Sequence, residues 1–341
     1  MTLIRSDFRD EVNRLEQRKL GNTDEQISAI GLGCMGLVGW YGERDDAEAA
    51  ATVHRALEIG VTHLDTAAVY QDGENERFVG TCIKGQRDGV FLATKCGMER
   101  TPEGKIQVDT RPDVIRKSCD ASLQRLGTDH IDLFYLHRID PVVPIEESMG
   151  AMAELVDAGK VRFVGVSEAS PATLRRAHDT YPVAALQSEL SLWSERSAQP
   201  ALDTCRELGI AFIAYSPLGR GFLTGAMKNI ADLPEGDTRK IFPRFHQDNM
   251  AANIAAAEQL SEFAKTINCT AAQLALAWVL AKWAGVLAIP GTKKRKYIEE
   301  NAAAAAIELT DADLQEIARK LPEDLVQGQR YPEIMMGTLD L

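Results

Sequence analysis

The sequence predicts a single (β/α)8 barrel, a TIM barrel, from three observations on its 341 residues. Eight short apolar runs rich in Val, Ile and Phe recur along the chain, and such runs are typical of parallel strands buried on both faces. Stretches with apolar residues at helical spacing separate most of these runs, which indicates a parallel sheet. No low-complexity linker divides the chain, so the eight strands favour one closed barrel over two domains.

The predicted elements follow the chain in order. The strands are expected at residues 30–35, 61–65, 90–95, 131–137, 161–167, 183–187, 210–215 and 286–290. Helices are expected at 46–59, 114–126, 145–158, from 171 onward, and at 198–208, with one long Ala-rich helix at 251–281 and a last one at 311–321. Gly127, Gly159 and Gly209 end three of these helices.

Two further segments fall outside this alternation. Residues 18–28 are expected to form a hairpin that plugs the N-terminal mouth of the barrel, and residues 217–250 form a long loop after the seventh strand. Loops of this length are often lids or binding loops. We therefore divide the chain into a polar N-terminal extension (1–17), the barrel (18–325) and a C-terminal tail (326–341).

Composition narrows the class of function. The formal net charge is -12 and the isoelectric point is about 5.1, which argues against a general binder of nucleic acid or anionic membranes. No apolar run reaches the roughly 18 residues that span a bilayer, and the charged N-terminus lacks the apolar core of a signal peptide. We expect a cytoplasmic protein with six free cysteines and no metal site, because a single His63-x-Asp65 pair is weak evidence for a metal.

The glycine motif Gly31-x-Gly33-x-x-Gly36 has the spacing of a dinucleotide-binding fingerprint. A true fingerprint opens a helix that holds the pyrophosphate, and an acid follows about twenty residues later. Here more glycines follow, no amphipathic stretch starts before Asp45, and Val53, His54 and Arg55 occupy the place of the acid. We predict a strand that runs into a glycine-rich loop, not a Rossmann turn.

Polar residues end the predicted strands. They are Asp65, Lys95, His137, Ser167, Gln187 and the pair Tyr215-Ser216. In a barrel these ends form the active-site face, and a buried Asp or Lys needs a partner, so we expect an Asp65–Lys95 ion pair. We expect Tyr70 to fold back over this pair, which would lower its pKa, and His137 to hydrogen-bond a carbonyl oxygen. Each residue alone is compatible with packing, but together they predict a site that polarises and protonates a carbonyl group.

These residues resemble the aldo-keto reductase superfamily. The matching stretches are DTAAVYQDGENERFVG, LATKCG, DLFYLHRID, VGVSEAS, QSELSLW, YSPLGRGFLTG and IPGTKKRKYIEEN, which run in order from residue 31 to residue 301. The last two of these stretches resemble the branch of the superfamily labelled auxin-induced or perakine-reductase-like. The resemblance implies a barrel that binds extended NADPH, with NADH less favoured, and a catalytic tetrad of Asp65, Tyr70, Lys95 and His137.

The resemblance also assigns the cofactor contacts. Gly33 and Met35 would lie under the nicotinamide, Ser167 and Gln187 would hold its carboxamide, and Tyr215 would stack on its ring. Ser216, Leu218, Gly219, Arg220 and Gly221 would hold the pyrophosphate. Gly291, Thr292 and Lys293 begin a basic run at a helix start, a good place for the 2′-phosphate, and Glu300 and Asn301 match adenine contacts.

Two departures from the family pattern affect these assignments. Glu168 stands where many relatives have Asn, and Tyr297 stands where many have Arg, so adenine stacking is left open between Tyr297 and Arg295. Trp40, together with Tyr70 and His137, is expected to contact the substrate. Tyr41, Trp193 and residues 242–245 are further aromatic candidates at the same mouth, although exposed aromatics also simply pack loops.

The resulting prediction is NADPH-dependent reduction of aldehydes or ketones to alcohols, with Tyr70 as general acid. Candidate substrates are aryl aldehydes, dicarbonyls, pyridoxal or a natural-product ketone. Two alternatives stay open: a nicotinamide-binding regulatory subunit with slow turnover, and a Schiff-base aldolase with Lys95 as nucleophile. The partner is expected to be a small carbonyl molecule, while the oligomeric state and the direction of the reaction in the cell are not readable from the sequence.

Overall fold

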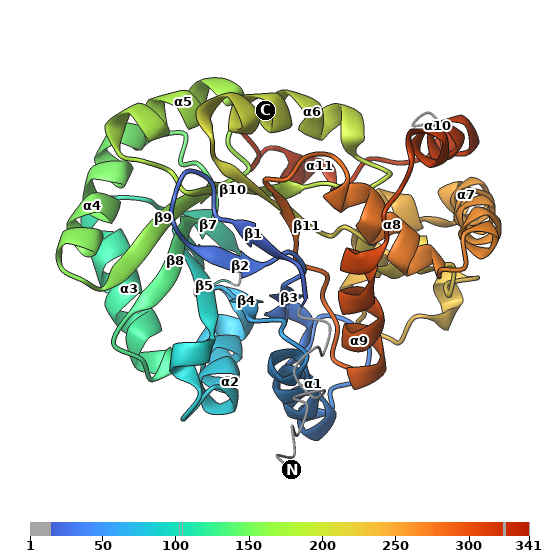
Figure 1. Ribbon diagram of the computed structural model, residues 1–341. Coiled ribbons are helices and arrows are strands. Elements are labelled where there is room, and N and C mark those ends of the chain that lie inside the picture. The colour runs from blue at the N-terminus through green and yellow to red at the C-terminus, as the bar shows by residue number, and fades with distance from the viewer. Residues whose placement is uncertain (1–14, 102, 104, 323–324, 341) are drawn as a thin grey trace, which may run out of the picture.

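The computed structural model describes residues 15–101, 103, 105–322 and 325–340 (Figure 1). Most of the predicted N-terminal extension lies outside these residues. Eight parallel strands form one curled sheet in which each strand pairs with its neighbours in chain order. They are β3 (Leu32–Gly33), β4 (His63–Asp65), β5 (Phe91–Cys96), β8 (Ile131–Leu136), β9 (Val161–Ser167), β10 (Ala185–Glu189), β11 (Ala211–Tyr215) and β12 (Val286–Ala288). Parallel bridges from Ile30 to Ala288 and from Gly33 to Gly291 close the sheet, which confirms the predicted barrel.

Strand alternation decides which side chains enter the barrel. Successive side chains on a strand point to opposite faces, so residues two apart share a face. Phe91 and Ala93 of β5 pack inside the barrel, whereas Leu92 packs outside against the helices. Lys95 continues the inward series of β5. On the other strands, too, every second side chain points into the barrel. The polar residues at the ends of the parallel strands therefore converge at the C-terminal mouth.

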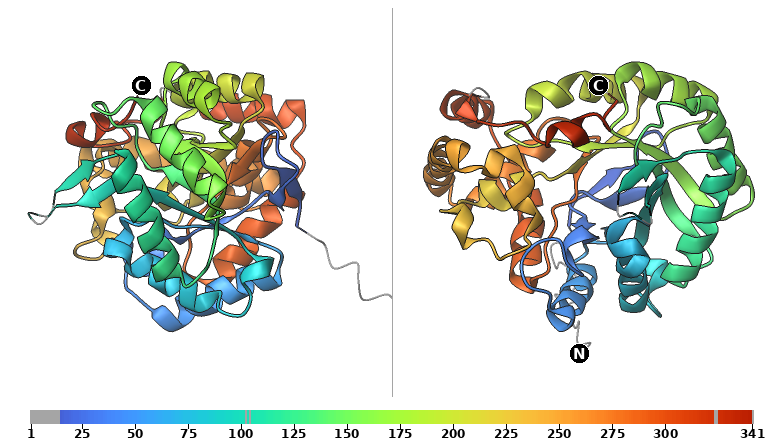
Figure 2. Two further views of the ribbon diagram at one scale, coloured as in Figure 1. Left: turned by 90° about the vertical axis from the view of Figure 1, so that its left-hand side faces the viewer. Right: turned by 180° about the vertical axis from the view of Figure 1, so that it is seen from behind.

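Helices cover the outside of the sheet (Figures 1 and 2). They are α1 (Asp46–Glu58), α2 (Glu74–Cys82), α3 (Pro112–Leu126), α4 (Ile145–Asp157), α5 (Pro171–Thr180), α6 (Glu195–Leu208), α8 (Ala271–Leu280) and α9 (Arg295–Ala303). Two more helices lie outside this layer: α7 (Gln247–Thr266) packs against α8, and α10 (Asp311–Lys320) packs against α7. The prediction of one long helix at 251–281 is wrong. Asn268 has a left-handed backbone (φ 54°), which ends α7, and Thr270 with Gln273 forms a capping box that starts α8.

The predicted hairpin is present as the antiparallel strands β1 (Gln17–Lys19) and β2 (Gln26–Ser28). Leu20 and Ile27 are buried against the inward-facing residues of the barrel strands, so the hairpin plugs the N-terminal mouth (Figure 1). Gly21 between the strands has φ +57°, and a Cβ there would lie 2.7 Å from the carbonyl oxygen of Gly209. Only glycine therefore lets this turn sit so close to the barrel.

Three segments gather at the opposite, C-terminal mouth. A second hairpin that the sequence analysis did not predict is formed by β6 (Met98–Arg100) and β7 (Ile106–Val108). The loop after β11 contains short 3-10 turns, including Gly219–Thr224. The C-terminal segment carries the short helix α11 (Glu333–Met336) and, seen from behind in Figure 2, crosses this end of the barrel. None of the helices formed by the described residues is long and apolar enough to cross a membrane.

Candidate active site

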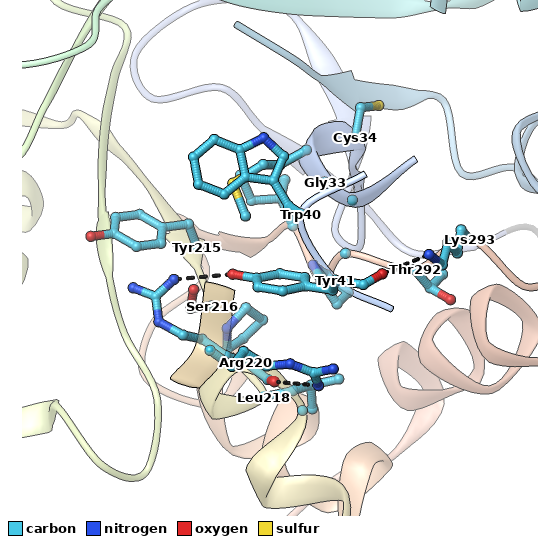
Figure 3. A pocket seen from close by; sticks show the side chains of 18 of the residues that line it. Gly33, Cys34, Trp40, Tyr41, Tyr215, Ser216, Leu218, Arg220, Thr292 and Lys293 are labelled. Carbon is cyan, nitrogen blue, oxygen red and sulfur yellow. Dashed lines mark hydrogen bonds between the residues drawn. The ribbon is translucent and has the colours of Figure 1, made fainter. Parts of the chain in front are cut away.

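A cavity of about 990 Å³ opens at the C-terminal mouth (Figure 3). Nearly all of the predicted site residues line it: Gly33, Met35, Trp40, Asp65, Tyr70, His137, Ser167, Gln187, Tyr215, Ser216, Leu218, Arg220, Gly221, Gly291, Thr292, Lys293, Glu300 and Asn301. Lys95 lies beneath the cavity floor, and Gly219 packs against Trp193 instead of lining the cavity. The described residues contain no group of three or more His, Cys, Asp or Glu side chains that would hold a metal ion.

The glycine motif forms part of the cavity floor and opens no helix. β3 ends at Gly33, a single 3-10 turn covers Cys34–Gly36, and the first long helix starts only at Asp46. A Cβ on Gly33 would lie 2.7 Å from the carbonyl oxygen of Ile289, so glycine is required where the first and last strands meet. The motif therefore serves barrel closure, and the structure agrees with the prediction against a Rossmann turn.

The Asp65–Lys95 ion pair is the centre of the site. Lys95 Nζ lies 2.5 Å from Asp65 Oδ1, and both side chains are fully buried. Lys95 also donates to the carbonyl oxygen of Thr66 (2.7 Å), while Gln187 Nε2 donates to Asp65 Oδ2 (2.8 Å). Burial alone would lower the pKa of Lys95, but the charge of Asp65, together with Tyr70 and the hydrogen bonds to both, outweighs burial and the pKa is raised. The side chain is therefore held as an ammonium ion.

Tyr70 lies above this pair, on a 3-10 turn that follows β4. Lys95 Nζ is 5.2 Å from the centroid of its ring, and the His137 ring packs edge-on at 5.7 Å. The prediction that Lys95 lowers the pKa of Tyr70 overall is wrong in this structure. Burial raises the pKa of the phenol, and the Lys95 charge offsets only part of that increase. Tyr70 is therefore a protonated phenol at neutral pH, next to a cation that stabilises its anion.

His137 follows β8 and is held as a neutral imidazole. Burial lowers its pKa well below the usual value, and the charges of Arg138 and Lys95 lower it further. Its Nδ1 has no hydrogen-bond partner among the described residues. A neutral imidazole offers one N–H, which suits a hydrogen bond to a carbonyl oxygen beside the phenol of Tyr70.

Glu168, the departure from the family pattern, points away from the cavity. Its backbone is left-handed (φ 54°), and its carboxylate lies 2.5 Å from Arg330 of the C-terminal segment. The same carboxylate accepts hydrogen bonds from the Ser188 hydroxyl and the Glu189 amide, each at 3.0 Å. Glu168 does not line the cavity. Through its ion pair with Arg330 it instead anchors the C-terminal segment across the mouth.

A bridge of side chains spans the outer part of the cavity (Figure 3). Arg220 Nη1 donates to the Tyr41 hydroxyl (3.2 Å), and Lys293 Nζ donates to the carbonyl oxygens of Tyr41 and Glu43. Asp237 accepts from the Gly42 amide (3.0 Å). The loop after β3 is thus tied both to the loop after β11 and to the segment that precedes α9.

The far end of the cavity lies at the start of α9. Tyr297 lines the cavity here with Glu300 and Asn301, whereas Arg295 pairs with Glu48 on the surface at 2.9 Å and does not line it. Of the two residues that the sequence left open for adenine stacking, only Tyr297 therefore faces the cavity.

Several lining residues escaped the sequence analysis. Arg138, Met98, Ile106, Tyr331 and Met335 all line the cavity. Tyr331 is buried and its hydroxyl lies 2.9 Å from that of Tyr215, although they are far apart in sequence. Among the aromatic candidates, Tyr41 and Phe242 line the cavity, but Trp193 is buried behind it against Phe222.

Fold and site together define a barrel protein with a tyrosine, a neutral histidine and a buried lysine–aspartate pair gathered at one cavity at the strand ends. The model of the Aldo/keto reductase family matches residues 29–322, and this chain belongs to that family. The chain is 44% identical over 321 residues to the NADP(+) aldo-keto reductase yakc of Schizosaccharomyces pombe, covering 92% of this chain and 94% of that protein.

Solved structures are similar over nearly the same length. The glycerol dehydrogenase AKR11B4 from Gluconobacter oxydans is 30% identical with a TM-score of 0.82, covering 90% of this chain and 96% of that one. An aldo/keto reductase from Klebsiella pneumoniae, solved with NADP and acetate, is 28% identical with a TM-score of 0.70, covering 93% of this chain and 99% of that one.

Proposed function

We propose that this protein reduces aldehydes or ketones to alcohols with NADPH, and that Tyr70 is the proton donor. The observation that carries the proposal is the convergence of Tyr70, His137 and the Asp65–Lys95 pair at a cavity of about 990 Å³ that extends to the start of α9. The relative from Schizosaccharomyces pombe carries NADP(+) in its name, and the Klebsiella pneumoniae structure contains NADP, which supports this cofactor.

The residues along the cavity fit NADPH. The Arg220 side chain is 10% exposed, its Nη2 has no hydrogen-bond partner among the described residues, and the carboxylate of Glu189 lies 3.8 Å away. That carboxylate already pairs with Arg244 at 3.0 Å. Arg220 is thus a cation placed for a pyrophosphate, as the family assignment implies. At the far end, Thr292 and Lys293 line the cavity where the family assignment places the 2′-phosphate, while the first amide of α9, that of Arg295, is bonded to Glu48.

When bound, NADPH supplies the hydride that reduces the carbonyl carbon. The chain's own groups act on the carbonyl oxygen. The N–H of neutral His137 orients that oxygen by a hydrogen bond, and the Tyr70 hydroxyl gives it a proton. Lys95 stabilises the resulting phenolate by its charge, and Asp65 holds Lys95 in place and keeps it protonated.

The test is NADPH oxidation with 4-nitrobenzaldehyde by Tyr70→Phe. We expect the rate of the chemical step to fall about 10²- to 10⁴-fold, with NADPH affinity unchanged. Tyr135→Phe is the matched control, because Tyr135 is buried with its ring 6.0 Å from Lys95 Nζ but does not line the cavity. Equal rates for Tyr70→Phe and wild type would remove Tyr70 from this role.

Two other results would favour the alternative functions. Tight NADPH binding with no turnover in the wild type would favour a regulatory subunit. A borohydride-trapped substrate adduct on Lys95 would favour an aldolase. The structure disfavours an aldolase, since Lys95 is held as an ammonium by Asp65 and lies beneath the cavity floor.

A further inference from the structure

Arg138 is a buried cation at the catalytic end of the cavity that has no carboxylate partner. Its side chain lines the cavity, yet the residue is only 8% exposed. One terminal nitrogen donates to the carbonyl oxygen of His137 (2.8 Å) and lies 3.5 Å from the Ser167 hydroxyl, and Nε has no partner. No carboxylate of the described residues lies within 4.0 Å of this guanidinium. A buried, unpaired charge is costly unless an opposite charge reaches it.

The neighbouring carboxylates are already taken. Asp65 pairs with Lys95, Glu168 pairs with Arg330 at 2.5 Å, and Glu189 pairs with Arg244. Each of these acids therefore has a cation of its own.

Arg244 and Arg220 share the carboxylate of Glu189, and Arg138 has none among the described residues, so these cations outnumber the nearby acids in a protein with a net charge of -12. Arg220 lies in the part of the cavity proposed for the pyrophosphate. Arg138 lies at the other end, where the reduced nicotinamide ring carries no negative charge to neutralise it.

We propose that Arg138 binds a carboxylate carried by the substrate, so that the site favours acidic carbonyl compounds over neutral ones of the same shape. This inference rests on the proposed function. Arg138 directly follows His137, so an anionic group that reaches Arg138 lies close to the carbonyl that His137 orients. The apolar remainder of such a substrate would face Trp40, Tyr331 and Met335, which line the same cavity.

The experiment compares 2-, 3- and 4-formylbenzoate with 2-, 3- and 4-nitrobenzaldehyde. Carboxylate and nitro groups are both planar and similar in size, but only the carboxylate is charged. In the wild type, kcat/KM for at least one formylbenzoate should exceed that for the matched nitro compound. Arg138→Gln should lower this carboxylate-to-nitro ratio about 10- to 100-fold, with Arg138→Lys in between. Arg175→Gln, which removes the same charge from the outer face of α5, should leave the ratio unchanged.

Three results would overturn the inference. One is no carboxylate preference at any ring position in the wild type, and another is an unchanged ratio in Arg138→Gln. The third is an equal loss for both substrate series together with weaker NADPH binding, which would place Arg138 on the cofactor. Should Arg138→Gln fail to fold, methyl esters of the formylbenzoates tested on the wild type remove the same charge from the substrate instead.

A binding measurement separates failure of this inference from failure of the proposed function. Benzoate has no reducible carbonyl, so calorimetric titration into the wild type and Arg138→Gln, each with NADP+, needs no turnover. Benzoate binding that is lost in Arg138→Gln supports the carboxylate site even if no aldehyde is reduced. Equal benzoate binding by both proteins counts against the site even if reduction is fast.

Discussion

Replacing Lys95 with Met tests whether the buried ion pair is needed for stability, for catalysis or for both. The substitution removes the ammonium that contacts Asp65 Oδ1 at 2.5 Å and the Thr66 carbonyl oxygen at 2.7 Å. Asp65 would then keep one hydrogen bond, from Gln187, for a carboxylate with almost no solvent exposure. Removing one partner of a buried pair typically costs about 3–5 kcal/mol, because the other charge is left uncompensated.

The lost free energy of unfolding can be expressed as a fall in the melting temperature. At about 2.1 cal/mol/K of unfolding entropy per residue, a chain of 341 residues loses about 1.4 °C per kcal/mol. Lys95→Met should therefore melt about 4–7 °C below the wild type. The double variant Lys95→Met/Asp65→Leu removes both charges and should regain at least half of that loss.

Activity should not follow stability in these variants. The Lys95 charge favours the phenolate of Tyr70, so both variants lose the cation that would stabilise the charge left when the proton departs. We expect both the single and the double variant to reduce 4-nitrobenzaldehyde about 100- to 1000-fold more slowly. Calorimetry and single-turnover kinetics on the same preparations measure the two effects separately.

Two outcomes would refute this reasoning. If Lys95→Met had the melting temperature of the wild type, the ion pair would make no net contribution to stability. A double variant that melts below the single one would show that Asp65 is not left uncompensated by loss of the lysine.

Three further predictions concern residues around the site. Burial lowers the pKa of His63 to about 4. Between pH 6.5 and pH 4 the unfolded chain therefore binds a proton at this histidine that the native protein does not bind, and the free energy of unfolding falls as the pH drops through that window. His63→Leu should shrink the loss of unfolding free energy between pH 7 and pH 5 by about 2 kcal/mol, measured by urea denaturation, whereas an unchanged loss would assign it to other groups. Asp237→Asn weakens the bond to the Gly42 amide and should speed NADPH release about 3- to 10-fold in stopped-flow fluorescence; equal release rates would mean that the bridge does not gate the cofactor. Glu168→Gln should free the C-terminal segment and speed tryptic cleavage after Arg330 about tenfold or more, while Glu207→Gln in a surface pair should not; equal protection in both would argue against the anchor.

Much of the fold was predictable because the strands are largely apolar runs, and six of the eight predicted runs end in a polar residue. Strand alternation places those polar ends on one face, so the Asp65–Lys95 pair followed from sequence alone. The break between α7 and α8 was also readable, since Thr270 and Gln273 have capping-box spacing, but the Ala-rich composition on both sides masked it.

The residues that were missed come from contacts that span the chain. Tyr331 meets Tyr215 only because the C-terminal segment folds back over the mouth, and the Glu168–Arg330 pair that anchors it joins residues 162 positions apart. Arg138 adjoins the predicted His137, yet nothing in the sequence shows that the acids around it are already paired. Only the folded structure shows which cation each of these acids contacts.

The sign of the pKa shift of Tyr70 was mispredicted for a physical reason that also bears on the mechanism. The sequence shows that a lysine is near but does not show how completely the phenol is buried, and burial disfavours the charged form of any group. The same burial keeps His137 neutral, so both groups face the cavity uncharged, one with an O–H and the other with a ring N–H to offer. In the proposed reaction, Lys95 would interact most strongly with Tyr70 after the proton has left, when the phenolate forms beside it. An interaction that strengthens as charge develops lowers the barrier, whereas one that is already complete in the ground state only strengthens binding. A tyrosine with its pKa held up by burial, above a lysine fixed by an aspartate, therefore suits proton donation better than a tyrosine that is ionised beforehand.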